Sequence, residues 1–216
     1  MRNMPRTVWG CPFQNCFERL NPSNSASNFA NPSLSVRIAV EKEIFKPSQT
    51  ILELGAGNLR NALFIMNSIP LIKIFAYELE PTIQRFSHNY RLFKKAGGQI
   101  IKGEIGIRKY DIIVSTFVLE TICPSTRRKA YLSKMYRALK GRGILIASFR
   151  GYPGVIGSRY YTCPMEEGLV SPLGTFVKPY DIPEIISLLT EVGFKSISFL
   201  QKYRCDRPRN IHLIAF

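Results

Sequence analysis

Two acidic residues and a pair of glycines stand where a nucleoside ligand could be held. The stretch "ILELGAG" (51–57) is an apolar run that ends in Gly55-Ala56-Gly57, with Glu53 just before the glycines. Glycine in a strand-to-helix turn lets the backbone approach a ligand, because a Cβ would collide with it. A carboxylate repels a pyrophosphate, whereas it attracts an ammonium or sulfonium group. The charge of Glu53 therefore favours a positively charged nucleoside ligand.

The residues around this turn exclude two phosphate-binding motifs and add a second acid. The dinucleotide fingerprint G-x-G-x-x-G needs a glycine at position 60, which is Arg60, and no G-K-[ST] follows to make a phosphate loop. Glu78 ends a second apolar run in "YELEP", 25 positions after Glu53. One carboxylate can accept hydrogen bonds from two ribose hydroxyls, so Glu78 is a candidate ribose ligand.

The elements that must position these residues follow from alternating apolar runs and amphipathic stretches. Strands are predicted at 50–55, 71–78, 98–102, 110–117, 143–149, 194–200 and 210–216, and helices at 33–45, 58–69, 81–96, 125–140 and 181–193. Gly141 suits the position just after the fourth of these helices. The pattern predicts an α/β fold with a doubly wound, mostly parallel seven-stranded sheet, an antiparallel C-terminal strand and helices on both faces.

In their order and spacing these motifs resemble the class I, Rossmann-like S-adenosylmethionine-dependent methyltransferases. "LELGAG" is similar to the first motif of that family, "YELEP" to its acidic second-strand motif and "KGE" (102–104) to the acid after its third strand. "YDIIVSTFVLETI" resembles the fourth-strand segment, and "LLTEVGFKSISFL" with "IHLIAF" resembles the closing antiparallel pair. The resemblance covers roughly residues 34 to 216 and implies methyl transfer with S-adenosylmethionine as the cofactor.

The resemblance also implies a role for each matched residue. Glu53, Gly55, Ala56, Gly57 and Asn58 would face the methionine end of the cofactor, Glu78 the ribose, Leu79 and Glu104 the adenine, and Ser115 and Thr116 the sulfonium. Leu59 departs from the family, which often has a glycine there. The link 103–110 is short. It can cross beneath the first strand or form a hairpin, and a hairpin would put the role of Glu104 in doubt.

The methyl acceptor is less well defined by the sequence. The fourth strand lacks the Asn/Asp-Pro-Pro-aromatic signature of nucleobase amine methylation, and no Pro-Cys nucleophile motif occurs. Glu120, just beyond that strand, is a candidate catalytic base, whereas His88 and His212 are expected in core or surface positions. The segment 150–180 is expected to be an irregular substrate or lid loop. Its candidate acceptor ligands, which could equally pack the loop, are Arg150, Arg159, Tyr160, Tyr161 and Tyr180.

The charge of the chain leaves alternatives open. Thirty Lys and Arg residues against fifteen Asp and Glu give a net charge of +15, which favours an anionic partner. The first hypothesis is a small-molecule methyltransferase whose acceptor is anionic or aromatic. The alternatives are a nucleic-acid methyltransferase that uses the basic surface, and a binding module that lost catalysis. No concentrated basic and aromatic stripe supports nucleic acid.

Composition limits the remaining classes of protein. The five cysteines are scattered and odd in number, which argues against a disulfide scaffold, and Cys11 and Cys16 lack the partners of a metal site, so none is predicted. No apolar run is long enough to span a bilayer, and we expect a cytoplasmic protein. Residues 1–32, rich in Asn, Ser and Pro, are predicted to form an irregular arm before a single domain at 33–216.

Overall fold

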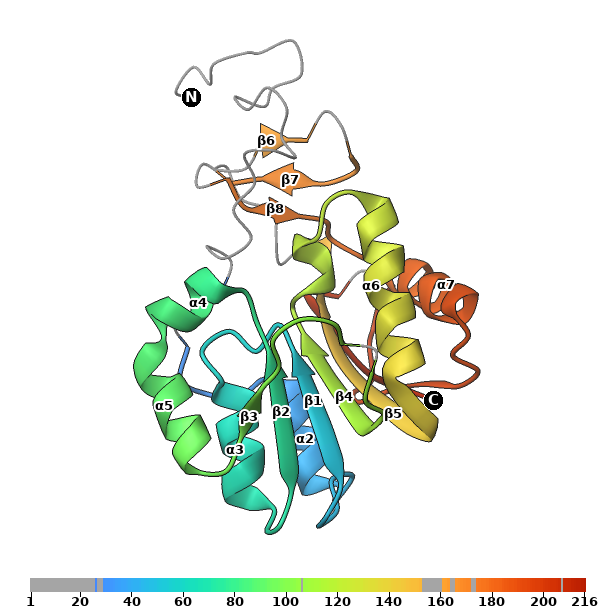
Figure 1. Ribbon diagram of the computed structural model, residues 1–216. Coiled ribbons are helices and arrows are strands. Elements are labelled where there is room, and N and C mark those ends of the chain that lie inside the picture. Colours follow the sequence, from blue (N-terminus) through green and yellow to red (C-terminus); the bar gives the residue numbers. More distant parts are fainter. Residues whose placement is uncertain are drawn as a thin grey trace.

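A seven-stranded sheet forms the centre of the part of the chain that the computed structural model describes, residues 26, 29–105, 107–152, 161–163, 166–171, 174–206 and 208–216. Its strands are β1 (Thr50–Leu54), β2 (Lys73–Tyr77), β3 (Gln99–Ile100), β4 (Tyr110–Thr116), β5 (Leu139–Arg150), β9 (Ile197–Phe199) and β10 (Asn210–Ala215). The helices are α2 (Leu34–Glu41), α3 (Arg60–Ser68), α4 (Glu80–Arg85), α5 (Ser87–Lys95), the 3₁₀ helix η2 (Leu119–Thr121), α6 (Ser125–Ala138) and α7 (Ile182–Val192). Figure 1 shows this arrangement.

The strand order β3-β2-β1-β4-β5-β10-β9 confirms the predicted doubly wound sheet. β1 runs parallel to both β2 and β4, β5 is parallel to β4, and β10 is antiparallel to β5 and to β9. β3 pairs in parallel with β2, so the connection from β3 to β4 passes to the other side of β1. That connection is therefore a crossover, and the alternative of a hairpin is wrong.

Helices cover both faces of the sheet because its central strands are apolar on both faces. Ile51 packs in a core with α2, α3 and α5, whereas its neighbour Leu52 packs in a second core with α6 and α7. Successive residues of a strand point to opposite faces, so an unbroken apolar run indicates a strand buried on both sides. In Figure 1, α6 lies in front of the sheet and α2 behind it. This sandwich leaves the carboxyl ends of the strands at one edge of the domain.

Two helix boundaries differ from the prediction. α6 ends at Ala138. The next residue, Leu139, is already extended and begins β5, where it pairs with Tyr110 of β4. Gly141 therefore lies inside a strand rather than after a helix, because pairing with β4 outweighs the local signal. The predicted helix 81–96 is divided into α4 and α5 at Phe86, which leaves the helical conformation with φ −108° and ψ 29°.

The segment 150–180 is not wholly irregular, and that expectation was wrong. It contains β6 (Tyr161–Thr162), β7 (Leu169–Val170) and β8 (Phe176–Val177), which form a small antiparallel sheet above the strand ends (Figure 1). Strands of two residues are too short to show an alternating pattern. Glu166, between β6 and β7, connects this sheet to α6, because it accepts hydrogen bonds from Ser125 N–H at 3.0 Å and from Arg128 Nη2 at 3.0 Å.

We expect Glu166→Ala to lower the free energy of unfolding by about 3 kcal/mol, because it leaves the charge of Arg128 buried and unpaired. The Arg128 and Glu166 side chains are only 7% and 15% exposed. Although burial would raise the pKa of Glu166, Ser125 N–H and Arg128 hold it below its usual value. The contribution of Glu166 is thus present at neutral pH and lost on acidification.

Urea unfolding at neutral pH measures this effect, and α6 offers a matched control. Glu191→Ala removes the exposed ion pair with Lys129, whose side chains are 56% and 54% exposed, and should change stability by less than about 1 kcal/mol. Equal losses in the two variants would show that Glu166 does not fasten the β6–β8 sheet.

Candidate functional site

A pocket of about 880 Å³ lies at the carboxyl ends of the central strands. Its lining comes from the ends of β1, β2, β4, β5 and β10, from η2 and α6, and from residues 26 and 29–34. The chain leaves β1 toward β2 on one side and returns to β4 on the other, so the strand order reverses here. Ligands of doubly wound sheets bind at such a reversal.

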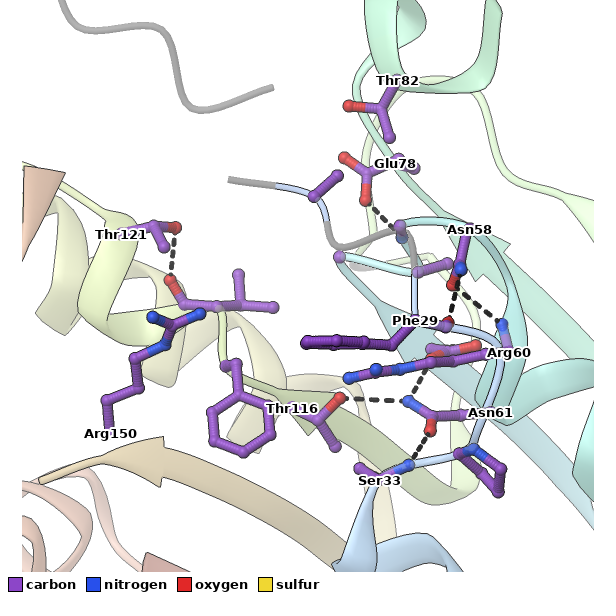
Figure 2. A pocket seen from close by; sticks show the side chains of 18 of the residues that line it. Phe29, Ser33, Asn58, Arg60, Asn61, Glu78, Thr82, Thr116, Thr121 and Arg150 are labelled. Carbon is purple, nitrogen blue, oxygen red and sulfur yellow. Dashed lines mark hydrogen bonds between the residues drawn. The ribbon is translucent and has the colours of Figure 1, made fainter. Parts of the chain in front are cut away.

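Two walls of the pocket differ in composition. We call Glu53, Gly55, Ala56, Gly57, Asn58, Glu78 and Leu79 the glycine wall. We call Thr116, Phe117, Val118, Arg150, Arg209 and His212 the arginine wall. Figure 2 shows Glu78 and Asn58 on one side of the pocket and Arg150 on the other, with Arg60 extending between them.

The glycine turn has the backbone conformation that its sequence requires. Gly55 and Gly57 have φ values of +70° and +55°, and a Cβ on Gly55 would lie 2.4 Å from Val118 Cγ2. Leu59 also adopts a positive φ, +64°, with its side chain fully buried. The residue that departs from the resembled family therefore keeps a backbone conformation that glycine favours.

Glu53 is a buried carboxylate directly beneath this turn. It is 2% exposed, and its oxygens accept hydrogen bonds from Asn61 Nδ2 at 2.8 Å and from Ala62 N–H at 3.1 Å. Burial raises the pKa of Glu53 to about 8 in spite of these two donors. Such a group is held neutral at pH 7 and ionises when a cation binds beside it.

Asn61 connects the walls and was not predicted from the sequence. Its Oδ1 accepts from Ser33 N–H at 2.8 Å, while its Nδ2 donates to Glu53 and to Thr116 Oγ1 at 3.0 Å. Figure 2 shows these bonds converging on Asn61. An asparagine in the first turn of the amphipathic helix α3 is the sequence signal that could have indicated this role. In the structure Asn61 is 2% exposed.

Glu78 stands at the end of β2 and touches the glycine turn. Its Oε2 accepts from Gly57 N–H at 2.6 Å (Figure 2), and its Oε1 accepts from Leu79 N–H at 2.7 Å. Burial raises the pKa of Glu78, and the two backbone N–H groups oppose that rise. The carboxylate thus holds the turn and also faces the pocket.

Residues just before α2 close part of the pocket. Asn58 Nδ2 donates to the Phe29 carbonyl at 2.7 Å, and Ser33 N–H binds Asn61. Ala26 and residues 29–34 belong to the lining. The end of the predicted arm therefore contributes to the site, which no local motif in 1–32 indicates.

The arginine wall includes a buried histidine that the sequence did not single out. His212 is 3% exposed, and its Nδ1 lies 2.9 Å from Ser148 Oγ, which is 2.7 Å from Ser35 Oγ. Burial lowers the pKa of His212 to about 4, so the imidazole is neutral at pH 7. Phe117 packs edge-on against the imidazole, with the ring centroids 6.0 Å apart.

Other predicted site residues lie outside this lining, and their assigned roles stay predictions. Ser115 is buried with its hydroxyl 2.9 Å from Tyr131 Oη, and Glu104 is exposed. Glu120 and Tyr180 are fully buried. Arg159, Tyr160 and the side chain of Tyr161 are outside the described residues.

Two classes of site find no support within the described ranges. They contain no group of three or more His, Cys, Asp or Glu residues placed to hold a metal ion, and Cys11 and Cys16 lie outside them. The described helices include none with the length and apolar character needed to cross a membrane.

Solved structures share this fold at low sequence identity. The CcbJ methyltransferase from Streptomyces caelestis matches with a TM-score of 0.65 and 12% identity, over 91% of this chain and 96% of that one. The 1,6-didemethyltoxoflavin-N1-methyltransferase from Burkholderia thailandensis, solved with 1,6-didemethyltoxoflavin and S-adenosylhomocysteine, gives 0.56 and 13%, over 84% and 77%. A candidate O-methyltransferase from Nostoc punctiforme gives 0.60 and 18% over 84% of this chain, which spans only 55% of that protein. No protein-family model and no curated protein matches the sequence.

Proposed function

We propose that this protein is an S-adenosylmethionine-dependent methyltransferase that acts on a small-molecule acceptor. The observation that carries the proposal is the position of two carboxylates around one glycine turn. Glu53 lies buried beneath the turn, and Glu78 binds the Gly57 N–H of the same turn at 2.6 Å. Both face a pocket at the reversal of strand order.

The residues of the glycine wall fit this cofactor. Glu53 would hold the ammonium group, because a buried carboxylate whose pKa is raised to about 8 gains most from a nearby cation. Glu78 would accept hydrogen bonds from the ribose hydroxyls, and Leu79, which is 41% exposed, would lie against the adenine. The fold comparisons support this cofactor, since matched structures were solved with S-adenosylhomocysteine.

S-adenosylmethionine supplies an activated methyl group on a cationic sulfur, so the protein needs mainly to align the acceptor for in-line displacement. Thr116 would lie beside the sulfonium, held by Asn61 Nδ2 at 3.0 Å. Phe117 and Val118 continue the wall beyond it and would position the acceptor. Neutral His212 would face the acceptor from β10.

The size of the pocket supports a small-molecule acceptor. About 880 Å³ is near the upper end of the ~300–1,000 Å³ usual for ligand sites. It is bounded by residues 29–34 on one side and by η2 and α6 on another. The matched Burkholderia thailandensis enzyme was solved with 1,6-didemethyltoxoflavin bound, which agrees with a small-molecule acceptor.

Calorimetric titration with S-adenosylmethionine and S-adenosylhomocysteine tests the proposal. We expect both to bind, and Glu78→Ala to weaken binding by ~30-fold, about 2 kcal/mol, because two ribose hydrogen bonds to a carboxylate are lost. Glu80→Ala, an exposed acid on α4 outside the pocket, is the matched control and should bind like the wild type. A folded wild-type protein that binds neither compound would refute the proposed function.

A further inference from the structure

The pocket lining carries more positive charge than the single carboxylate of the cofactor can neutralise. Arg60, Arg127, Arg150 and Arg209 belong to the lining, whereas its acidic members are Glu53 and Glu78. S-adenosylmethionine carries one carboxylate, and Arg60 would bind it, since the charge of Arg60 interacts with Glu53 at the expected ammonium site as well as with Arg150. The positive charge on the arginine wall is therefore left for another ligand.

Arg150 is held in position by a buried acid. Glu120 is fully buried, and no side chain among the described residues donates a hydrogen bond to its carboxylate oxygens. Its Oε1 lies 3.7 Å from Arg150 Nε, and no other acidic residue in the described part of the chain forms an ion pair with Arg150. A buried carboxylate with no side-chain donor is unfavourable unless a cation stays beside it. Glu120 thus fixes one edge of the guanidinium, while Arg150 also lines the pocket.

The backbone places Arg209 next to Arg150. In the β5–β10 ladder Arg150 pairs with Asn210, and Gly151 N–H donates to the Arg209 carbonyl at 2.9 Å. A Cβ on Gly151 would lie 1.7 Å from the Pro208 carbonyl oxygen, so the two segments are in close contact. Arg150 and Arg209 both line the pocket, so two guanidinium groups are available there to an anion such as a carboxylate or phosphate.

We infer that the methyl acceptor carries a carboxylate or phosphate group, which Arg150 binds with Arg209 on the arginine wall, Glu120 being the positioning residue for Arg150. This inference rests on the proposed function, because it assumes that the cofactor occupies the glycine wall. Figure 2 shows Arg150 on the wall opposite Glu78, with Phe29 and Arg60 extending between them.

Glu120 gives this site a pH dependence. The side chains that face Glu120 are Arg150 from β5, Tyr131 from α6 and Tyr180, which follows β8. The backbone N–H of Lys178, also after β8, donates to the main-chain carbonyl of Glu120. Burial raises the pKa of both phenols, so they stay neutral, and the Lys178 ammonium is paired with Glu167 and Glu184. Burial also raises the pKa of Glu120 to about 7. An anion on Arg150 competes with ionised Glu120 and therefore binds with uptake of a proton.

Titration of the S-adenosylhomocysteine complex with benzoate, phenyl phosphate and neutral benzamide tests the inference. We expect an anion to bind more tightly than benzamide, and Arg150→Gln to weaken that binding at least ~tenfold through loss of a charged hydrogen-bond pair. The preferred anion distinguishes a carboxylate from a phosphate acceptor. Arg142→Gln, an exposed arginine at the other end of β5, is the matched control and should bind like the wild type.

The result separates this inference from the proposed function. Wild-type protein that binds S-adenosylhomocysteine but neither anion, or Arg150→Gln that binds the anion unchanged, would overturn the inference alone. Failure to bind S-adenosylhomocysteine would overturn the proposed function and, with it, the inference. Glu120→Gln provides a second readout: anion affinity of the wild-type complex should fall as the pH rises through about 7, and this fall should be absent in the variant.

Discussion

Glu53→Gln is expected to weaken binding of S-adenosylmethionine by ~100-fold at pH 8.5, which corresponds to about 2.7 kcal/mol. The variant keeps the shape of the side chain but cannot carry the negative charge that would face the ammonium group. Glu53 is only 2% exposed, so water screens that charge little. Calorimetry in two buffers of different ionisation enthalpy should also show proton release on cofactor binding by the wild type and none by the variant.

The same substitution changes how stability depends on pH. The pKa of Glu53 is raised from 4.5 to about 8, so the folded state holds a proton that the unfolded state releases within this window. The free energy of unfolding of the wild type therefore falls as pH rises through the window, and this part of the fall is absent from the variant. Glu120 contributes a similar slope to both proteins and cancels in the comparison. Identical pH profiles for the two proteins would contradict the assigned environment of Glu53.

Asn61→Leu should produce the largest loss of stability, about 4 kcal/mol, because three groups, two of them buried, lose a hydrogen-bond partner at once. Those groups are the Ser33 N–H, the Glu53 carboxylate and the Thr116 hydroxyl. Leucine fits a helix well and is apolar, so neither helix propensity nor hydrophobicity accounts for such a loss. Urea unfolding monitored by circular dichroism measures it.

Asn67 offers the control for this experiment, since it lies on the same helix but is exposed. Asn67→Leu should change the free energy of unfolding by less than about 0.5 kcal/mol. If Asn61→Leu were equally mild, the hydrogen bonds that connect the two walls would contribute nothing measurable. The role given to Thr116 beside the sulfonium would then lose its structural support.

The sequence predicted the sheet well because its strands are buried on both faces. An apolar run between two helices, such as 110–117, predicts a strand buried on both faces, and the structure has β4 at Tyr110–Thr116. Boundaries set by distant partners were predicted less well. Leu139 joins β5 because Tyr110 pairs with it, and no neighbour of Leu139 in the sequence signals this.

The same contrast holds for the site. Glu53, the glycine turn and Glu78 lie in local motifs, and the structure brings them together around one pocket. Asn61 and His212 gain their positions from contacts with residues far away in the chain, Ser33 and Ser148. Their side chains look ordinary in the sequence, because an asparagine or histidine shows a functional environment only once its partners are placed.

The two walls of the pocket also differ in how they are encoded. Apart from Phe29 and its neighbours, the glycine side of the pocket is drawn from residues 53–82, almost one continuous stretch. The arginine wall is assembled from 116–118, Arg150, Arg209 and His212, which lie at or near the ends of three separate strands. Under the proposed function, substitutions that alter the cofactor side would fall in one stretch of the chain, whereas the acceptor side would be altered one strand end at a time. New acceptor preferences could therefore arise on this scaffold while the cofactor is kept.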